Sequence, residues 1–408
     1  MTTYHETIEW MYSQLPMYQR KGAAAYRPGL EAMNAIIKHL GDPHKAFKSI
    51  HVGGTNGKGS TSHMIASVLQ TAGFKTGLYS SPHLLDFRER IKVNGIEIPK
   101  KEVVDFISKY KPYFEINKLS FFEMTVGLAF WYFKKAQIDY AVVEVGMGGR
   151  LDATNIIYPE LAVITNIGLD HTQFLGDTHQ KIAQEKAGII KEGIGVVIGE
   201  KDPRTQKVFE SVAQSKSASL VYAEEYTETF ECDLKGGYQT HNIKTAAAAL
   251  NNIPGLKLDP LAIRNGLNNV VGNTKLMGRW QKLGNFPEVI LDVAHNNEGL
   301  SSIAEQVKEL NYNKLHLVMG FLQGREVKEL LALFPLPTNF YLSSPALERA
   351  IPLQNLKETL QNTSFQITFT NTIAEAYTKA LSDAAKEDIV LVTGSTFVVA
   401  EILEQLKS

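Results

Sequence analysis

Short runs of apolar and β-branched residues recur along the chain and alternate with longer stretches of helical character. The runs that predict strands are residues 49–52, 140–145, 161–166, 196–198, 289–293, 315–319, 339–342 and 389–393. Strands that alternate with helices in this way predict an α/β fold, in which helices cover both faces of a mainly parallel sheet. Ligand sites in such sheets lie at the carboxyl ends of the strands.

The most informative stretch follows the first predicted strand, where glycines, a lysine and hydroxyl groups precede a helix-like segment at residues 62–71. Its sequence is Gly53-Gly54-Thr55-Asn56-Gly57-Lys58-Gly59-Ser60-Thr61. A glycine-rich turn before a helix presents backbone N–H groups to phosphate oxygens, while the lysine neutralises phosphate charge and a hydroxyl reaches Mg²⁺. The pattern predicts a nucleoside triphosphate site. It departs from the common G-x-x-x-x-G-K-[ST] form, because Val52 replaces the first glycine and Gly59 separates Lys58 from Ser60.

A break near residues 272–279 predicts the end of a first domain, because loop-forming residues gather there and a new series of strands follows. We expect residues 1–275 to form an N-terminal P-loop ATPase domain with a mainly parallel sheet. Residues 276–408 are expected to form a smaller, Rossmann-like α/β domain, and both sizes are ordinary for domains. Residues 221–240 have the least clear pattern, and we expect strands or an insertion there.

Composition and charge exclude several classes of protein. A net charge of −1 offers no general attraction for nucleic acid or an anionic membrane. The longest apolar run, residues 126–133, is far shorter than the ~20 residues of a membrane-spanning helix. Residues 1–22 lack the apolar region of a signal peptide, and the single cysteine, Cys232, fits a reducing compartment. We therefore expect a cytoplasmic monomer without nucleic-acid or membrane partners.

Three polar residues of the first domain are candidates for chemistry. Glu144 ends an apolar strand, where a carboxylate needs a cation or hydrogen-bond donors, so it is either a Mg²⁺ ligand or a cap of the glycine-rich turn that follows. His171 also follows a strand, but its position alone is more typical of a structural or surface histidine. Lys186 stands beside Glu185, as on a solvated helix face; the sharper alternative is a buried lysine that reacts with CO₂ to form a metal-binding carbamate.

The second domain offers three further candidates. Asp292 and His295 end a predicted strand, and Arg279 lies just after the predicted domain boundary. An arginine at this place can bind a triphosphate in a bidentate manner. Its position alone favours the simpler alternative, a salt bridge at the boundary.

Taken together, the motifs resemble the Mur ligase superfamily and, more narrowly, the folylpolyglutamate synthase and dihydrofolate synthase family. The resemblance covers nearly the whole chain, and the extra Gly59 is typical of this family's phosphate loop. The matching motifs are residues 27–33, 51–60, 80–84, 89–91, 122–125, 144–155, 169–171, 185–191, 239–242, 278–279, 292–296 and 392–395.

The resemblance implies roles for individual residues. The expected ATP-binding residues are Gly54, Thr55, Asn56, Gly57, Lys58, Gly59, Ser60, Asn242, Arg279 and Asp292. Two Mg²⁺ ions are implied, with ligands from Ser60, Ser81, Glu144, His171 and Lys186 as a carbamate. The implied folate or pteroate pocket contains Ser81, Pro82, His83, Phe122 and Asp152. The implied catalytic residues are Lys58, Lys186, Arg279 and His295.

The same resemblance implies an ATP-dependent ligase that joins L-glutamate to a folate carboxylate. The carboxylate would attack the γ-phosphate of ATP, and the amine of glutamate would then attack the acyl phosphate to form an amide. The acceptor would be dihydropteroate or a tetrahydrofolate. Residues 149–155 look like those of bifunctional bacterial members, so we expect both activities, with small molecules as the only partners.

Three other functions share part of this pattern. A Mur-type ligase of peptidoglycan precursors shares the fold and chemistry, but such enzymes typically carry a UDP-sugar domain ahead of the phosphate loop. A catalytically silent nucleotide-binding protein would be expected to lack Lys58, Glu144 or His171, and all three are present. The loop spacing disfavours a P-loop kinase. Departures from the family at Trp280-Gln281, Val293 and Asn297 affect the expected fine geometry and leave every implied ligand in place.

Overall fold

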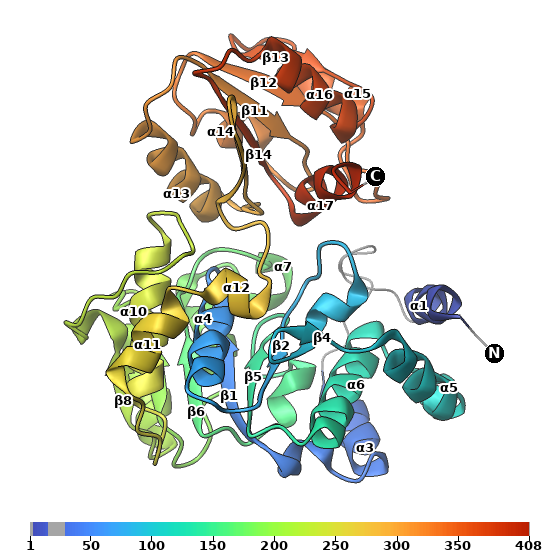
Figure 1. The fold of residues 1–408 in the computed structure, drawn as a ribbon, viewed down its shortest axis with the longest axis vertical. Coiled ribbons are helices and arrows are strands. Elements are labelled where there is room, and N and C mark those ends of the chain that lie inside the picture. Colours follow the sequence, from blue (N-terminus) through green and yellow to red (C-terminus); the bar gives the residue numbers. More distant parts are fainter. Residues whose placement is uncertain (1–2, 15–28, 408) are drawn as a thin grey trace. The chain divides into compact units, whose positions relative to one another are not determined.

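The computed structural model describes residues 3–14 and 29–407, so residues 27 and 28 of the first family motif lie outside the described residues. The chain folds into two compact units (Figure 1), one of residues 1–233 and 239–276 and one of residues 234–238 and 277–408. The main division, between residues 276 and 277, lies one residue from the boundary that the sequence predicts.

The first unit is built on an eight-stranded sheet with the order β4-β3-β2-β5-β1-β6-β7-β8. Six strands are parallel, and β3 and β4 form an antiparallel edge. The strands are β1 (Lys48–Gly53), β2 (Thr76–Tyr79), β3 (Ile91–Val93), β4 (Ile96–Glu97), β5 (Tyr140–Glu144), β6 (Leu161–Ile164), β7 (Val196–Ile198) and β8 (Leu220–Tyr222).

Helices cover both faces of this sheet. One face packs against α3, α5, α6, α8 and α9, and the other packs against α4, which in turn contacts α10, α11 and α12. The α-helices are α1 (Tyr4–Ser13), α3 (Glu31–His39), α4 (Lys58–Thr71), α5 (Lys100–Asn117), α6 (Phe121–Ala136), α7 (Thr172–Leu175), α8 (His179–Ala187), α9 (Gln206–Ser215), α10 (Gln239–Asn251), α11 (Pro260–Leu267) and α12 (Val270–Thr274). Single 3₁₀ turns are η2 (Pro43–Ala46), η3 (Phe87–Arg90), η4 (Ala153–Ile156) and η5 (Ala223–Glu225).

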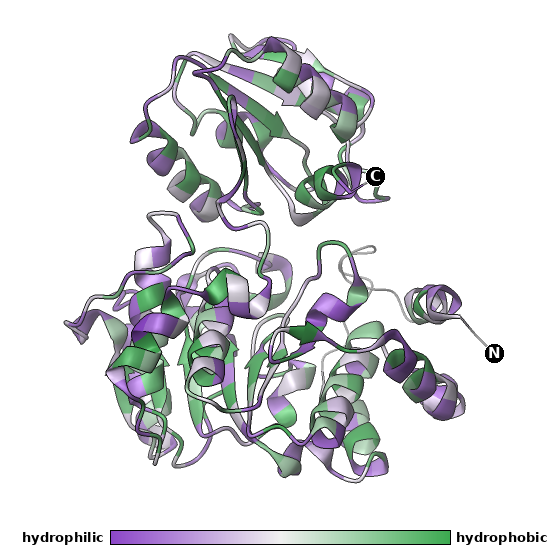
Figure 2. Cartoon of the chain, viewed as in Figure 1, coloured by the Kyte–Doolittle hydropathy of each residue, from purple (hydrophilic) through white to green (hydrophobic). Residues whose placement is uncertain are grey.

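The second unit contains a six-stranded sheet with the order β13-β12-β11-β14-β10-β9, in which β9 alone is antiparallel. Its strands are β9 (Gln281–Asn285), β10 (Glu288–Leu291), β11 (Leu315–Met319), β12 (Thr338–Leu342), β13 (Gln366–Phe369) and β14 (Ile389–Thr393). Its helices are α13 (Asn297–Lys308), α14 (Val327–Leu331), α15 (Leu353–Leu360), α16 (Ile373–Asp383) and α17 (Thr396–Gln405). In both units the central strands are strongly apolar, as the green ribbons of Figure 2 show.

The predicted α/β fold is confirmed, and all eight predicted strands are present within one or two residues of their expected bounds. Six further strands are present that the sequence did not predict or predicted only in part: β2, β3, β4, β8, β9 and β13. In the uncertain stretch at residues 221–240, only the first two residues belong to a strand. A short 3₁₀ turn, loop residues 226–238 and the start of α10 make up the rest.

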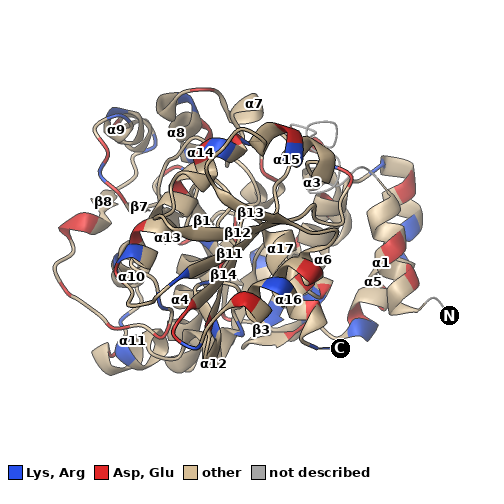
Figure 3. Cartoon of the chain, turned by 90° about the horizontal axis from the view of Figure 1, so that it is seen from above, with Lys and Arg blue, Asp and Glu red and all other residues tan. Residues whose placement is uncertain are grey.

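The long apolar run at residues 126–133 lies inside α6, where it is almost entirely buried in the core of the first unit. Within the part of the chain that the structure describes, no helix combines the length and the hydropathy needed to cross a membrane. Acidic and basic residues share the same helices, as on α5 and α16 (Figure 3). This mixture agrees with the near-zero net charge.

Candidate functional site

The phosphate loop connects β1 to α4 and can only be built with glycine at two positions. Gly54 and Gly57 have φ angles of 138° and 80°, which strain a residue with a side chain. A Cβ atom at Gly54 would lie 1.8 Å from Thr165 Oγ1, and one at Gly57 would lie 2.1 Å from Asn242 Oδ1. The loop is therefore packed directly against the end of β6 and against α10, which places Asn242 at its edge.

Asn166 uses two of the N–H groups that the sequence assigned to phosphate binding. The N–H of Thr55 donates to Asn166 O over 2.9 Å, and that of Asn56 donates to Asn166 Oδ1 over 2.8 Å. Thr165 Oγ1 donates to Asn56 O over 2.6 Å and fixes the same turn. Because two of its amides are already bonded, the loop offers an anion chiefly the N-terminus of α4, from Gly57 onward.

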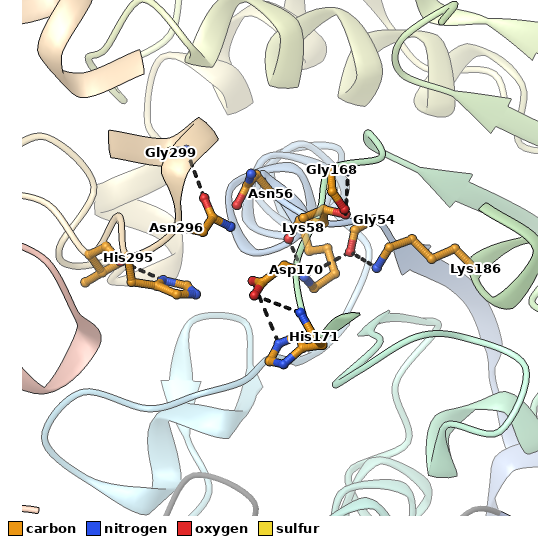
Figure 4. A network of polar contacts seen from close by, with 12 residues as sticks. Gly54, Asn56, Lys58, Gly168, Asp170, His171, Lys186, His295, Asn296 and Gly299 are labelled. Atoms are coloured by element: carbon orange, nitrogen blue, oxygen red, sulfur yellow. Dashed lines mark hydrogen bonds and ion pairs between the residues drawn. The ribbon is translucent and has the colours of Figure 1, made fainter. Parts of the chain in front are cut away.

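Two lysines bond to a single carbonyl oxygen of this loop (Figure 4). Lys58 Nζ donates to Gly54 O over 3.1 Å and to Thr55 O over 2.9 Å, and Lys186 Nζ donates to Gly54 O over 2.7 Å. Lys186 is only 4% exposed. Burial, followed by the charge of Lys58, lowers the pKa of the Lys186 amine to about 7, and nearby Asp170 and Asp152 only partly oppose the shift. Lys186 therefore lies inside, and the solvated helix face is excluded.

Glu144 lies at the end of β5 and is 4% exposed. Its Oε2 accepts a hydrogen bond of 3.1 Å from the N–H of Ser81, which follows the neighbouring strand β2. Ser60 is equally buried, in the first turn of α4, and its Oγ accepts a bond of 3.2 Å from Gln239 Nε2. Asn242 Nδ2 in turn donates to Gln239 Oε1 over 2.8 Å. These contacts join Ser60 and Asn242 in one network beside the phosphate loop.

His171 starts the short helix α7 in a left-handed conformation, with a φ angle of 51°. Its N–H donates to Asp170 Oδ1 over 2.9 Å, and its Nε2 lies 3.9 Å from Asp170 Oδ2. Among the described residues, no group of three or more histidine, cysteine, aspartate or glutamate side chains could hold a metal ion. A cation would therefore need hydroxyl ligands or a modified Lys186 in addition to Glu144 and His171.

The residues predicted to bind folate lie in chain segments near Glu144. His83 Nδ1 accepts a bond of 2.7 Å from Arg90 Nε, so its Nε2 carries the proton and lies 3.2 Å from the Tyr12 hydroxyl. Phe122 is half-buried and packs against Gly146, where a Cβ would approach within 2.4 Å of its ring. An aromatic ring held in this way is suited to stacking on a flat ligand.

Asp152 is turned into its own loop. It is buried, and its carboxylate accepts hydrogen bonds of 2.9 Å from the N–H groups of Met147 and Thr154, as well as a short one from Thr154 Oγ1. Burial raises the pKa of Asp152, and these hydrogen bonds oppose the shift. The structure thus shows Asp152 fixing the turn after β5.

In the second unit, the predicted residues surround the end of β10. Asp292 is 3% exposed, and its carboxylate accepts bonds from Tyr238 Oη (2.6 Å), Trp280 N (2.8 Å) and Ala294 N (2.9 Å). Arg279 Nη1 donates to Gly278 O over 3.2 Å, and His295 Nδ1 lies 3.1 Å from Val293 O. Burial raises the pKa of Asp292, while Tyr238 and Arg279 lower it. The nucleotide-binding roles of these residues stay predictions.

Several residues that organise the site were missed: Thr165, Asn166, Gln239 and Tyr238. Thr165 and Asn166 had a usable signal, because polar residues directly after a parallel strand lie at the ligand edge of the sheet. Gln239 lies in a family motif, but the resemblance implies no role for it. Nothing in the sequence near Tyr238 indicates its bond to Asp292, which lies far along the chain.

Family models match both units. The Mur ligase middle domain matches residues 52–253, and the Mur ligase glutamate ligase domain matches residues 278–396. The dihydrofolate synthase/folylpolyglutamate synthase of Escherichia coli K12 is 35% identical to this chain. The match covers 92% of this chain and 90% of the relative. That of Bacillus subtilis is 31% identical over the full length of both.

Two further relatives are longer. The probable bifunctional folylpolyglutamate synthase/dihydropteroate synthase of Haloferax volcanii is 33% identical, and this chain spans half of its length; the Halobacterium salinarum relative is matched over a similar share. Among solved structures, E. coli FolC in complex with DHPP and ADP has a TM-score of 0.88 at 31% identity and covers 99% of this chain and 98% of its own. The chain belongs to the Mur ligase family and, within it, to the dihydrofolate synthase/folylpolyglutamate synthase family.

Proposed function

We propose that this chain is an ATP-dependent ligase that adds L-glutamate to a reduced folate and to dihydropteroate. The observation that carries the proposal is the junction at Gly54 O, where Lys58 of the phosphate loop and the buried amine of Lys186 meet. A phosphate-binding lysine beside a buried amine with a pKa lowered to about 7, which is about half neutral at that pH, suits phosphoryl transfer to a carboxylate. The names of the full-length bacterial relatives supply the substrates.

ATP would bind with its phosphates at the N-terminus of α4. The helix is fourteen residues long, so its N–H groups and dipole favour phosphate oxygens. Lys58 would leave the carbonyls of Gly54 and Thr55 and bond to the outer phosphates. Asn166 would keep the loop in shape during this exchange, because its bonds to Thr55 and Asn56 do not involve Lys58.

Lys186 would act as a carbamate. Its neutral Nζ can attack the carbon of CO₂ and release a proton, and the product carries two oxygen atoms in place of a cation. With Glu144, Ser60 and Ser81, these atoms form a set of hard oxygen ligands, and His171 adds one nitrogen; this donor set fits Mg²⁺. When bound, Mg²⁺ neutralises charge on the ATP phosphates. A solved relative contains Mn, AMPPNP and L-glutamate.

The acceptor would lie against Phe122 and the segment 81–83, with its carboxylate directed at the phosphate loop. A carboxylate oxygen attacks the γ-phosphorus, ADP leaves, and an acyl phosphate forms. The amine of glutamate then attacks the acyl carbon, phosphate leaves, and the nitrogen loses a proton to give the amide. Positioning of this kind lowers barriers by roughly 7–11 kcal/mol, and Lys58 stabilises charge on the transferring group.

The second unit is proposed to supply the glutamate-ligase domain, and Arg279, Asp292 and His295 are proposed to act on the nucleotide. Their support is the match of residues 278–396 to the glutamate ligase domain. We also propose that the enzyme is cytoplasmic, since one cysteine suits a reducing compartment, and that it works as a monomer.

The test is to supply dihydropteroate, a tetrahydrofolate and a UDP-muramyl acceptor separately, each with ATP, Mg²⁺ and labelled glutamate. Label in both pteridine acceptors supports the bifunctional ligase. Label in only one of them restricts the enzyme to that activity. Label in the muramyl acceptor alone would overturn the proposal in favour of a cell-wall ligase, and label in none would leave a nucleotide-binding protein without this activity.

A further inference from the structure

Asn155 ties together the two segments that carry Glu144 and Lys186. Its Nδ2 donates to Arg150 O and to Gly188 O, each over 3.0 Å. Arg150 lies in the loop that follows β5 and Glu144, and Gly188 directly follows α8, which carries Lys186. Asn155 is 4% exposed, so water does not compete freely for these two carbonyl groups.

The same two segments approach each other unusually closely. The N–H of Arg150 donates to Glu185 O over 2.8 Å. A Cβ atom at Gly149 would lie 2.8 Å from the carbonyl oxygens of Glu185 and Lys186, and one at Gly188 would lie 2.4 Å from the α-carbon of Arg150. Backbone therefore packs on backbone, and any change in the spacing of the segments displaces Lys186 relative to β5.

The side chain of Asn155 acts at this junction only as a hydrogen-bond donor. Among the described residues its Oδ1 has no hydrogen-bond partner, although the atom is buried. The ion pair of Arg150 with Glu185 also spans the junction, at 2.9 Å, but the Arg150 side chain is 53% exposed. Ion pairs in such exposed positions contribute little to stability. The buried hydrogen bonds of the Asn155 amide therefore hold the two segments together more strongly than the exposed ion pair does.

We propose that Asn155 is a positioning residue that sets the separation of Glu144 and the carbamate of Lys186, and so sets the affinity for the divalent cation. The inference rests on the proposed function, because it takes these two groups as ligands. Mg²⁺ requires near-ideal octahedral geometry with short bonds, so a small shift of α8 weakens binding. Groups that orient metal ligands typically change metal affinity 10–100-fold when they are replaced.

The test replaces Asn155 with leucine, which has the same branching at Cγ but no hydrogen-bond donor. Asn251→Leu is the control for the loss of two amide hydrogen bonds away from the site, because Asn251 is exposed at the far end of α10 and its Nδ2 bonds to Tyr226 Oη and Ala247 O. Mn²⁺ binding is measured by electron paramagnetic resonance with a non-hydrolysable ATP analogue. Carbamate on Lys186 is measured by carbon NMR with labelled bicarbonate, and KM for Mg²⁺ and kcat are measured in the ligase reaction.

For Asn155→Leu we expect Mn²⁺ affinity to fall at least tenfold and KM for Mg²⁺ to rise in parallel, with unchanged values for Asn251→Leu. Equal Mn²⁺ affinity in Asn155→Leu and the wild type would overturn the inference. A variant with a lower kcat but with unchanged Mn²⁺ affinity and an unchanged carbamate signal would also overturn it. If the leucine variant does not fold, Asn155→Ser, which keeps one donor, is judged by the same criteria. A wild type that binds Mn²⁺ but adds no glutamate would count against the proposed function alone.

Discussion

Lys186 shows what a single buried amine does to stability. Its pKa falls from 10.5 to about 7 because burial disfavours the charged form. Between these two values the unfolded chain binds the proton and the folded chain does not, so the free energy of unfolding rises with pH across this window. Below about pH 7 both states carry the proton, and the folded state bears the full penalty.

We therefore predict that Lys186→Met stabilises the folded chain at pH 7 by up to about 4 kcal/mol, from roughly 1.4 kcal/mol per unit of pKa shift. The gain should shrink steadily as the pH is raised from 7 toward 10.5. Chemical unfolding without metal or bicarbonate, at several pH values, measures it. Lys109→Met, on the exposed side of α5, is the control and should show no such slope. Equal pH slopes for both variants would contradict the prediction.

Lys186 can also be tested for its role in the reaction, apart from its effect on stability. Lys186→Ala is expected to lose at least a hundredfold in glutamate addition, as an order-of-magnitude figure for a lost metal ligand, and to recover part of it when acetate or another small carboxylate is added. The added carboxylate would take the place of the carbamate oxygens. Lys58→Ala should lose activity without any such recovery. Wild-type turnover by Lys186→Ala without additives would rule out the carbamate.

At this scale, the sequence identified residues whose type is itself unusual. A lysine in a phosphate loop and a glutamate at a strand end stand out, and the structure brings both to the same edge of the sheet. Asn155 and Asn166 were not identified as positioning residues, because asparagine is common after strands and in turns. Their importance lies in which backbone groups they bond to, which a sequence does not specify. Asp152 had acceptor chemistry suited to a ligand, but its own turn provides the donors.

At the scale of an element, α4 and the loop before it form a rigid unit that depends on glycine. We predict that Gly57→Ala raises KM for ATP about tenfold or more and destabilises the fold by ~1–3 kcal/mol, because a positive φ and a clash with Asn242 Oδ1 coincide there. ATP titration and chemical unfolding provide the two measurements.

Gly73, just past the other end of α4, gives a matched control. Its φ of 91° is equally unfavourable for alanine, but nothing lies within 4 Å of an added Cβ atom. Gly73→Ala should lose about 1 kcal/mol from the same backbone strain and keep the wild-type KM for ATP. If both variants raise KM alike, strain in the helix rather than the geometry of the loop controls ATP binding.

Strands were predicted where burial on both faces produces a continuous apolar run. β1 and β5 are of this kind, and nearly all of their residues are buried. The prediction failed for β3, which has only three residues, and for β9, whose residues are exposed or half-exposed. Such edge strands are held by pairing with a neighbour rather than by their own pattern.

At the scale of the whole molecule, the chain enters the second unit twice. Residues 234–238 belong to that unit, although residues 239–276 return to the first. The sequence predicts a single boundary near residue 275 and gives no indication that residues 234–238 belong to the second unit. Its consequence is local: Tyr238 provides one of the donors that satisfy the buried carboxylate of Asp292.

We predict that Tyr238→Phe destabilises the second unit by ~1–3 kcal/mol at pH 7, because it removes a hydrogen bond to a buried carboxylate. Burial already holds the folded pKa of Asp292 above its usual value. Losing a donor raises this pKa further, so the deficit should shrink as the pH falls toward 4 and Asp292 becomes protonated in the folded state of both the variant and the wild type. Urea unfolding followed by fluorescence, with Trp280 as the only remaining tryptophan, reports on this unit.

The control is Tyr226→Phe, whose hydroxyl also donates to a carboxylate, that of Glu228, over 3.0 Å, but at an exposed position. Its removal should change the free energy of unfolding by less than about 0.5 kcal/mol at either pH. A deficit for Tyr238→Phe that is the same at pH 4 and pH 7 would show that the hydroxyl contributes through packing. No deficit at all would show that residues 234–238 are not held in the second unit by this bond, and the bonds from Trp280 and Ala294 would then suffice for Asp292.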